Sequence, residues 1–547
     1  MPAGAGGGET KLSTDPVDNG PAPGLAAAWH RHPIGVPKKK AGVRRGINIP
    51  PAVCQNSAHR VPVQGLKPPM LQSPSVIAFI LLAFHVVGLV AALHAVMTVR
   101  TAPGAIAWAG SLLMMPYVTL VPYLIFGRST FAGYVDARRF NDDRLREIRH
   151  GMTPREREAR SACVVHEPTQ VCMRALPRLT GMPCLANNDV RLLVNGTQTF
   201  DAIFAAIGQA REVLIVQFFI VHDDALGRRL QALLCERAQA GVKVYFLFDS
   251  IGCHALPRRY VRTLLEAGVD ARPFSTHRGF VNRFQLNFRN HRKLVIVDGR
   301  EAFIGGHNVG VEYLGEHPPL APWRDTHIAL RGSAVLDLQM SFAEDWYWAA
   351  REVPHLLMPP AEVGGRMTCQ VVPTGPADSQ ETCSLFFVEA IQSARQRLWI
   401  TSPYFVPDEA VFAVLRLAVL RGVDVRILIP ARPDHVVVYA ASTIYAYQAV
   451  AAGIKLYRYQ PGFLHQKVIL IDDEAAAVGT ANLDNRSFRL NFELMVMTAD
   501  KGFAADVAAM LESDFASATR IGPDEFLGAP APLRVAMHVA KLFAPIL

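Results

Sequence analysis

The sequence predicts an α/β fold of two duplicated halves, preceded by a two-helix transmembrane hairpin. The pattern H-x-K-x-x-x-x-D occurs twice, from His291 to Asp298 and from His465 to Asp472, and both copies hold an apolar run typical of a strand covered on both sides. Two apolar stretches, residues 76–99 and 104–126, are each long enough to cross a hydrocarbon core of roughly 30 Å as a helix.

Composition allows this organisation but leaves the partner open. The 547 residues suffice for two globular domains plus membrane segments. The formal net charge of +9 suits an anionic partner, either nucleic acid, phospholipid headgroups or a membrane surface. Eight cysteines without a C-x-x-C pair indicate reduced structural thiols and favour a reducing compartment for the soluble part.

The N-terminal third divides into three segments. Residues 1–70 are rich in Gly, Pro, Ala and basic residues and are expected to form a disordered tail. Residues 71–127 form the predicted hairpin, and residues 128–189 are charged and irregular, as in a juxtamembrane linker. The connection between the two spans is too short for a domain, so both flanks should lie on one side. The flanks carry more basic residues than the connection, where only Arg100 lies, and the positive-inside rule therefore places the C-terminal part in the cytoplasm.

The two halves are residues 190–360 and 361–547. Residues 210–220 match 394–404, and residues 241–247 match 422–428, each as a strand of similar composition. Amphipathic stretches at 227–240 and 408–421 lie between these strands, which predicts β-α-β units around a mixed sheet in each half. The apolar and basic residues 532–547 are expected either to lie on the bilayer or to pack on the sheet.

The repeated motif has the side chains for exchange at a phosphodiester. His and Lys are two residues apart, so on a strand they project from the same face. Such an exchange needs a nucleophile, an acid for the leaving oxygen and cations or donors around phosphate, and histidine can serve in the first two roles. One copy supplies half of this set, and two copies facing each other supply all of it. The matched loops after each motif add the expected substrate-binding residues Gly306, Asn308, Thr480 and Asn482.

These residues resemble a known family. Segments 290–293, 322–327 and 479–488 are similar to those of the phospholipase D superfamily, most closely the bacterial cardiolipin synthases, and the resemblance covers nearly everything after residue 70. It implies two tandem phospholipase D-like α-β-α sandwich domains related by a pseudo-twofold axis. It also implies that one of His291 and His465 forms a phosphohistidine while the other protonates the leaving alcohol. Lys293 and Lys467 would hold the phosphate charge, and Asn308 and Asn482 would donate hydrogen bonds.

A carboxylate is expected behind each imidazole to orient it. In the second half Glu493 matches the orienting carboxylate of the family, and in the first half we assign this role to Asp325. Asp298 and Asp472 complete the catalytic motif, although we expect them to tie strand ends and loops together rather than to meet substrate. No cluster has metal-ligand spacing, so we expect no metal and no cofactor.

The resemblance implies a phosphatidyltransferase, multi-pass in the bacterial inner membrane, with its catalytic domains in the cytoplasm. It would convert two phosphatidylglycerol molecules into cardiolipin and glycerol. Its partners would be phosphatidylglycerol and cardiolipin in the membrane, without nucleic acid, and an oligomer is compatible with the sequence. The nearest alternative is a hydrolytic phospholipase D. A nuclease fits two membrane spans poorly, and a non-enzymatic scaffold fits two intact His/Lys pairs poorly. We expect a chain beginning near Val190 to keep the paired site.

Overall fold

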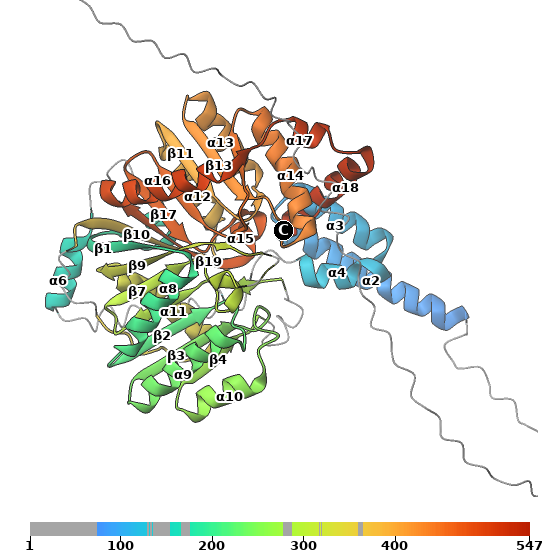
Figure 1. Ribbon diagram of the computed structural model, residues 1–547. Helices are drawn as coiled ribbons and strands as arrows, with labels where there is room; N and C mark the ends of the chain where they lie inside the picture. The colour runs from blue at the N-terminus through green and yellow to red at the C-terminus, as the bar shows by residue number, and fades with distance from the viewer. Residues whose placement is uncertain are drawn as a thin grey trace, which may run out of the picture.

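The computed structural model describes residues 74–127, 131, 134, 154–165, 175–276, 287–316, 318, 320–358 and 365–547. The expected disordered tail and most of the expected juxtamembrane linker lie outside these residues. Within them, a mixed α/β body carries apolar helices that project from one side (Figure 1).

One large mixed sheet of 16 strands runs through the body. In the first half, β2, β3 and β4 pair in parallel, and β6, β7 and β9 continue from β2 with antiparallel pairing. Except for the edge strand β4, these strands are rich in apolar residues and are almost fully buried, as expected for strands covered on both faces. Their bounds are β1 (Cys184–Val194), β2 (Val213–Phe218), β3 (Lys243–Asp249), β4 (Asp270–Phe274), β6 (Leu294–Val297), β7 (Glu301–Gly305) and β9 (Thr326–Gly332).

The second half repeats this strand order. Strands β11, β13 and β14 pair in parallel, and β16, β17 and β19 continue from β11 with antiparallel pairing. The halves join where β1 pairs antiparallel with β10. The bounds are β10 (Met367–Thr374), β11 (Arg397–Thr401), β13 (Asp424–Pro430), β14 (Lys455–Tyr459), β16 (Val468–Ile471), β17 (Ala475–Gly479), β19 (Asn491–Ala499) and β20 (Ala518–Arg520).

Helices cover both faces of the sheet (Figure 1). Their apolar faces complete the hydrophobic clusters that surround the strands. In the first half these helices are α6 (Pro154–Cys163), α7 (Leu176–Thr180), α8 (Asn195–Gly208), α9 (Ala225–Gln239), α10 (Arg258–Glu266) and α11 (Val335–Ala350). In the second half they are α12 (Thr382–Ser393), α13 (Glu409–Leu420), α14 (Val436–Ala451), α15 (Asn485–Arg489) and α16 (Lys501–Ala516), and α17 (Asp524–Leu527) and α18 (Ala531–Lys541) follow them in the chain.

Part of the expected linker belongs to the catalytic core. Strand β1 begins at Cys184 and pairs with β9 on one side and β10 on the other, so a boundary at residue 190 cuts a central strand. Phe131 and Tyr134 are buried, and both rings pack against Phe492 of the second half. Two residues of the expected juxtamembrane linker, Phe131 and Tyr134, therefore fill space between the halves.

The two-helix transmembrane hairpin is not confirmed. Helix α2 (Pro74–Thr98) is long and apolar enough to cross a membrane, but the second apolar stretch is divided into α3 (Ala102–Met114) and α4 (Pro116–Phe126). The break has a clear cause, because Pro116 has no amide hydrogen and Met115 has φ −139° and ψ 61° outside the helical region. With 13 and 11 residues, neither α3 nor α4 has the roughly 20 residues that a spanning helix needs.

The C-terminal helix α18 packs on a helix rather than directly on the sheet. Met537 and Ala540 lie in a cluster with Ala441 and Ile444 of α14. The opposite face of α18 exposes apolar side chains, among them Val535 and Val539. The expected amphipathic character is therefore present, with one face on protein and one face uncovered in the described chain.

Candidate active site

The two H-x-K motifs lie at the entrance of equivalent strands, and each is anchored to the other half. The two residues before His291 form β5 (Arg289–Asn290), which pairs in parallel with the start of β19. The two residues before His465 form β15 (Phe463–Leu464), which pairs in parallel with β8 (Trp323–Arg324). The amide of His291 donates to the carbonyl of Phe492 at 2.9 Å, and that of His465 donates to the carbonyl of Arg324 at 2.8 Å. The site is thus assembled by pairing between the halves.

The pairing of each histidine segment with the other half also decides which carboxylate contacts which imidazole. Nδ1 of His291 lies 2.9 Å from Oε2 of Glu493, and Nδ1 of His465 lies 2.7 Å from Oδ2 of Asp325. The expectation of a carboxylate behind each imidazole is confirmed. The expectation that each half supplies its own carboxylate is wrong, because the residue before each carboxylate pairs with the opposite histidine segment. With Nδ1–H donating to the carboxylate, Nε2 is the unprotonated nitrogen of each neutral ring.

Glu493 is held by three further side chains. Thr480 donates its hydroxyl to Oε2 at 2.6 Å, and Ser487 and Asn491 donate to Oε1 at 2.8 and 3.0 Å. Burial alone would raise the pKa of Glu493, but its interactions with His291, Lys293 and Thr480 outweigh burial and lower that pKa. The carboxylate is therefore ionised and fixed in position before substrate arrives.

Asp325 is held mainly by the backbone. The amide of Thr326 donates to Oδ1 at 2.8 Å, and the indole of Trp323 lies 3.5 Å from Oδ2. Gly306 lies so close that a Cβ atom there would be 2.0 Å from Oδ1. Burial would raise the pKa of Asp325, but its interactions with His307, His465 and Lys467 hold it well below its usual range. Gly306 therefore makes room for this carboxylate, which was not expected from the sequence.

Burial dominates the electrostatics of the four motif side chains. It lowers the pKa of His291 to about 4 and also lowers that of His465, so both imidazoles are neutral at pH 7. It lowers the pKa of Lys467 to about 8 and that of Lys293 well below its usual value. Lys467 contributes to the lowered pKa of His291, and Lys293 to that of His465, which is the mutual influence expected of one shared site.

The loop residues expected to bind substrate differ in their contacts. Asn308 uses both ends of its amide within the protein, since Oδ1 accepts from the amide of Ile220 at 3.2 Å and Nδ2 donates to Tyr313 at 3.0 Å. Asn482 is buried, and its Oδ1 has no hydrogen-bond partner among the described residues. Thr480 and Gly306 serve the two carboxylates. Asn482 is therefore the loop residue whose side chain is the most available to a ligand.

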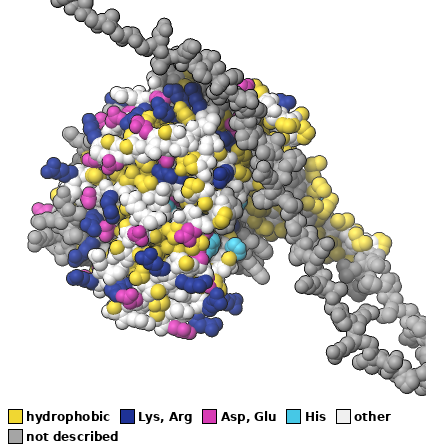
Figure 2. All heavy atoms as spheres, viewed as in Figure 1, with side chains coloured by type: hydrophobic (Ala, Val, Ile, Leu, Met, Phe, Trp, Pro, Cys, Tyr) yellow, Lys and Arg dark blue, Asp and Glu magenta, His cyan; other side chains and the backbone are white. Residues whose placement is uncertain are grey.

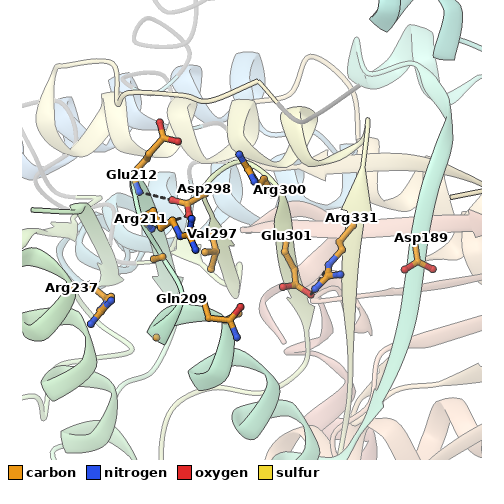
Figure 3. Close-up of a pocket in the computed structure, with 13 residues that line it drawn as sticks. Asp189, Gln209, Arg211, Glu212, Arg237, Val297, Asp298, Arg300, Glu301 and Arg331 are labelled. Atoms are coloured by element: carbon orange, nitrogen blue, oxygen red, sulfur yellow. Dashed lines mark hydrogen bonds and ion pairs between the residues drawn. The ribbon is translucent and has the colours of Figure 1, made fainter. Parts of the chain in front are cut away.

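Asp298 and Asp472 lie apart from the imidazoles. Asp298 follows β6 and Asp472 follows β16, so each aspartate lies at the end of its strand opposite to the histidine. A strand of four residues is about 13 Å long, which separates the two side chains. Figure 3 shows Asp298 in a surface pocket with Arg211 and Glu212. The carboxylate of Asp298 accepts hydrogen bonds from the backbone amides of these two residues at 2.9 and 2.8 Å. Asp472 accepts amides of residues 395–397 in the same way. Both aspartates tie strand ends, as expected, and their place in the catalytic motif does not bring them to the histidines.

A buried network behind His291 was missed. Oδ2 of Asp345 accepts from Arg292 at 2.9 Å, from Asn290 at 2.8 Å and from Gln217 at 2.7 Å. Oδ1 accepts the hydroxyl of Tyr134 at 2.7 Å. The available signal was the polar pair Asn290 and Arg292 on either side of His291, two residues that a buried segment carries only with partners.

The described residues contain one group with potential metal ligands, formed by His222, Asp224 and Glu312. Nδ1 of His222 lies 3.0 Å from Glu312. Both oxygens of Asp224 accept backbone amides, from Gly227 at 2.9 Å and from Val311 at 2.8 Å. These contacts explain the group as a cap at the start of α9, and it adds nothing to the site.

Comparisons with known proteins agree with this geometry. The domain family described as "Cardiolipin synthase, PLD-like domain" matches residues 203–317 and 387–516. Cardiolipin synthase A of Pseudomonas aeruginosa (strain LESB58) is 60% identical over 483 residues, covering 88% of this chain and 98% of that protein. Cardiolipin synthase A of Pseudomonas fluorescens (strain Pf-5) is 57% identical over 474 residues, covering 87% and 99%.

Among solved structures, the fold is similar to that of phosphatidylserine synthase from Haemophilus influenzae. The TM-score is 0.54 at 14% identity, and the match covers 68% of this chain and 99% of that one. That likeness concerns the fold alone. The match to the Pseudomonas proteins extends over nearly their whole length. The chain therefore belongs to the cardiolipin synthase family of the phospholipase D superfamily.

Proposed function

We propose that this protein is a phosphatidyltransferase that converts two phosphatidylglycerol molecules into cardiolipin and glycerol. The observation that carries the proposal is a pair of neutral, buried imidazoles, His291 and His465, each held through Nδ1 by an ionised carboxylate. Such an arrangement presents two Nε2 atoms with opposite tasks, one to bond phosphorus and one to move a proton.

The reaction proceeds in two displacements. In the first, one histidine takes up a proton on Nε2 when the anionic phosphodiester binds beside it. Nε2 of the other histidine attacks phosphorus, a P–N bond forms and the P–O bond to glycerol breaks, while the protonated histidine gives its proton to the departing oxygen. In the second, a hydroxyl of another phosphatidylglycerol gives its proton to that same acid histidine and attacks phosphorus, and the P–N bond breaks. The phosphatidyl group is thus transferred to the acceptor lipid, the acid histidine regains its proton, and the nucleophilic histidine is free again.

The remaining residues stabilise charge at phosphate. Lys293 and Lys467 are the buried cations of the site, and a bound phosphodiester anion raises their lowered pKa values by direct attraction. Asn482 has a buried side-chain amide for a non-bridging oxygen. Asp325 and Glu493 act as positioning residues, since they touch the imidazoles rather than the lipid. The chemistry proposed here uses no metal and no cofactor.

The finer architecture is also a proposal. We infer that a pseudo-twofold axis relates the halves, which is supported by the repeated strand order and by the two crossed His–carboxylate pairs. We further infer that the enzyme acts at the bacterial inner membrane with its catalytic halves in the cytoplasm. Among the described residues, Cys235, Cys253 and Cys383 are free thiols, which suits a reducing compartment.

The test is product analysis with purified protein. Detergent-solubilised enzyme should convert phosphatidylglycerol into cardiolipin and release one glycerol for each cardiolipin formed. A hydrolytic phospholipase D would instead form phosphatidic acid, with water as acceptor. Rapid quenching with labelled phosphatidylglycerol should trap phosphatidyl label on His291 or His465 alone. Phosphatidic acid as the main product in the presence of excess phosphatidylglycerol would contradict the proposal.

A further inference from the structure

The apolar segment after α2 turns back halfway along that helix. A Cβ atom on Gly88 would lie 2.7 Å from Cβ of Pro116 and 2.7 Å from the carbonyl of Leu112, so the break between α3 and α4 meets α2 at Gly88. Tyr123 follows Pro116 by seven residues, and its hydroxyl lies 2.7 Å from Nδ1 of His94. Since His94 is nearer than Gly88 to the C-terminal end of α2, α4 runs in the same direction as α2. A second spanning helix would run antiparallel to α2 along its whole length.

This turning point corresponds to half the thickness of a bilayer. Gly88 lies ten residues before the end of α2 at Thr98, which is about 15 Å along the helix axis, against a hydrocarbon core of roughly 30 Å. Before Gly88, the large apolar side chains of α2 are exposed, including Phe79, Leu82 and Val86. Figures 1 and 2 show α2 projecting from the body with hydrophobic side chains along it. One half of α2 therefore packs against α3 and α4, and the other half is bare.

Several polar backbone groups at the break have partners within the segment. The carbonyl of Ser111 accepts from the amide of Met115 at 2.9 Å and from the hydroxyl of Thr119 at 3.1 Å. The same hydroxyl donates to the carbonyl of Met115 at 2.7 Å. An unpaired backbone group in hydrocarbon costs several kcal/mol, so a helix break persists there only with such partners. The Thr119 hydroxyl thus makes this break compatible with a lipid environment.

Both ends of the segment lie against the catalytic body. Just before α3, the guanidinium of Arg100 lies 3.8 Å from Glu381 of the second half. Glu381 also pairs at 3.2 Å with Arg489 of α15, the short helix that follows Asn482. Just after α4, Phe131 is buried between the halves. A turn on the far side of the membrane is incompatible with the contact between Arg100 and Glu381.

We propose that residues 102–126 form a re-entrant helix pair, which enters only the leaflet on the side of the catalytic halves, while α2 alone crosses the bilayer. Its partner is the hydrocarbon of that leaflet, from which lipid reaches the site beside α15. In this topology the start of α2 at Pro74 lies on the opposite side of the membrane from the catalytic halves, and Arg100 lies on the same side as them. The proposal replaces the two-span hairpin and does not depend on the reaction assigned above.

The sidedness can be measured on the full chain in its native membrane. Pro74→Cys, Ala102→Cys and, as a marker of the catalytic side, Glu266→Cys on α10 are each labelled with a membrane-impermeant maleimide before and after cell disruption, with the unsubstituted protein as background. We expect Ala102→Cys and Glu266→Cys to react from one side and Pro74→Cys from the other. A two-span hairpin gives the inverse, with Pro74→Cys and Glu266→Cys together. All three on one side would also overturn the proposal.

Cysteine cross-linking tests the direction of α4 independently of sidedness. The pair His94→Cys with Tyr123→Cys should be joined in membranes by a short bifunctional maleimide, which spans the space left by the two longer side chains that the structure brings together. The matched pair Phe79→Cys with Tyr123→Cys should not, since it would be adjacent only if residues 104–126 ran antiparallel along all of α2. Cross-linking of the second pair without the first would overturn the re-entrant arrangement. Neither measurement uses activity, so failure of the proposed reaction would leave it intact.

Discussion

The two His–carboxylate pairs have the same geometry but are built from different parts. Glu493 is gripped by the side chains of Thr480, Ser487 and Asn491, whereas Asp325 rests on a backbone amide with Gly306 pressed against it. The loop position that holds Thr480 in the second copy holds Gly306 in the first. Thr480 contacts the longer carboxylate side chain, Glu493, and Gly306 lies against the shorter one, Asp325. Duplication therefore conserves the position of an oxygen atom rather than the residue that supplies it.

The supports behind the two histidine segments also differ in origin. Behind His291, Arg292 pairs with Asp345, and Asp345 also accepts from Tyr134 of the segment next to the membrane helices. Behind His465, Gln466 donates to Asp514 at 3.2 Å, and Asp514 also accepts from Arg324. The pair at His291 thus depends on a residue outside either half, and the pair at His465 does not.

Removal of that outside segment should have the largest effect. A chain that begins at Val190 lacks Tyr134, Phe131 and the first residues of β1, so we expect no folded, active protein. A chain that begins at Ser129 keeps all three and should turn over soluble short-chain phosphatidylglycerol. The two chains are compared by circular dichroism and by cardiolipin formation. Equal activity of both would mean that Tyr134 and the start of β1 are dispensable, as expected from the sequence alone.

Loss of either imidazole should nearly abolish the reaction. General acid–base help is typically worth about 10²- to 10⁴-fold, and loss of a nucleophile should cost at least as much. His291→Asn and His465→Asn should therefore both lower kcat by at least about 100-fold while the protein stays folded. His355 is exposed, and its backbone amide contacts Tyr245 of β3 rather than the active site. His355→Asn is therefore the control and should keep wild-type activity. A strong effect in only one of the two variants would break the comparison between the pairs.

Neutralising the carboxylates should cost less, about 10- to 100-fold in kcat, because the imidazoles remain. In Asp325→Asn and Glu493→Gln an amide replaces the acceptor of Nδ1–H, which favours the wrong tautomer. The crossed pairing predicts that Glu493→Gln couples energetically to His291→Asn and not to His465→Asn. Double-mutant cycles of thermal stability measure this coupling. Coupling within each half instead would contradict the crossed pairs.

The prediction of the halves from the sequence succeeded where a pattern depends on local structure. A His and a Lys two positions apart, followed by an apolar run, indicate the start of a strand whatever surrounds it, and the aspartates that cap the strand ends, Asp298 and Asp472, are equally local. The partner of each imidazole depends on which segments pair across the halves, and no local pattern records that. The burial of Tyr134 was equally hidden, because a single aromatic residue in a charged segment has no periodicity.

Deprotonation of Lys467 should give a tenfold loss per pH unit on the alkaline side. Its pKa is lowered to about 8 by burial, so the free enzyme loses this cation as the pH rises through about 8 and keeps it below. The profile of kcat/KM should therefore fall above about pH 8. In Lys467→Arg, a guanidinium that stays protonated should move this limb to higher pH, while Lys455→Arg at an exposed pair should leave it unchanged. An unchanged limb in Lys467→Arg would assign it to another group.

The smallest effect should come from the single hydroxyl that links the linker segment to the site. Tyr134→Phe leaves the ring packed against Phe492 but removes the hydrogen bond to Asp345, a buried charged acceptor. Hydrogen bonds to charged groups are worth about 1.5–3 kcal/mol, so the apparent Tm should fall measurably.

Activity should fall only a few-fold in Tyr134→Phe, because Arg292, Asn290 and Gln217 still hold Asp345. Tyr260→Phe is the matched control, because it removes another hydrogen bond of a buried hydroxyl. Tyr260 of α10 donates to the carbonyl of Gly227 in α9 at 2.6 Å, outside the active site. This variant should lower stability by a similar amount and leave kcat unchanged. If both variants lowered kcat equally, the loss would reflect general destabilisation, and the asymmetry between the two histidine supports would have no consequence for the reaction.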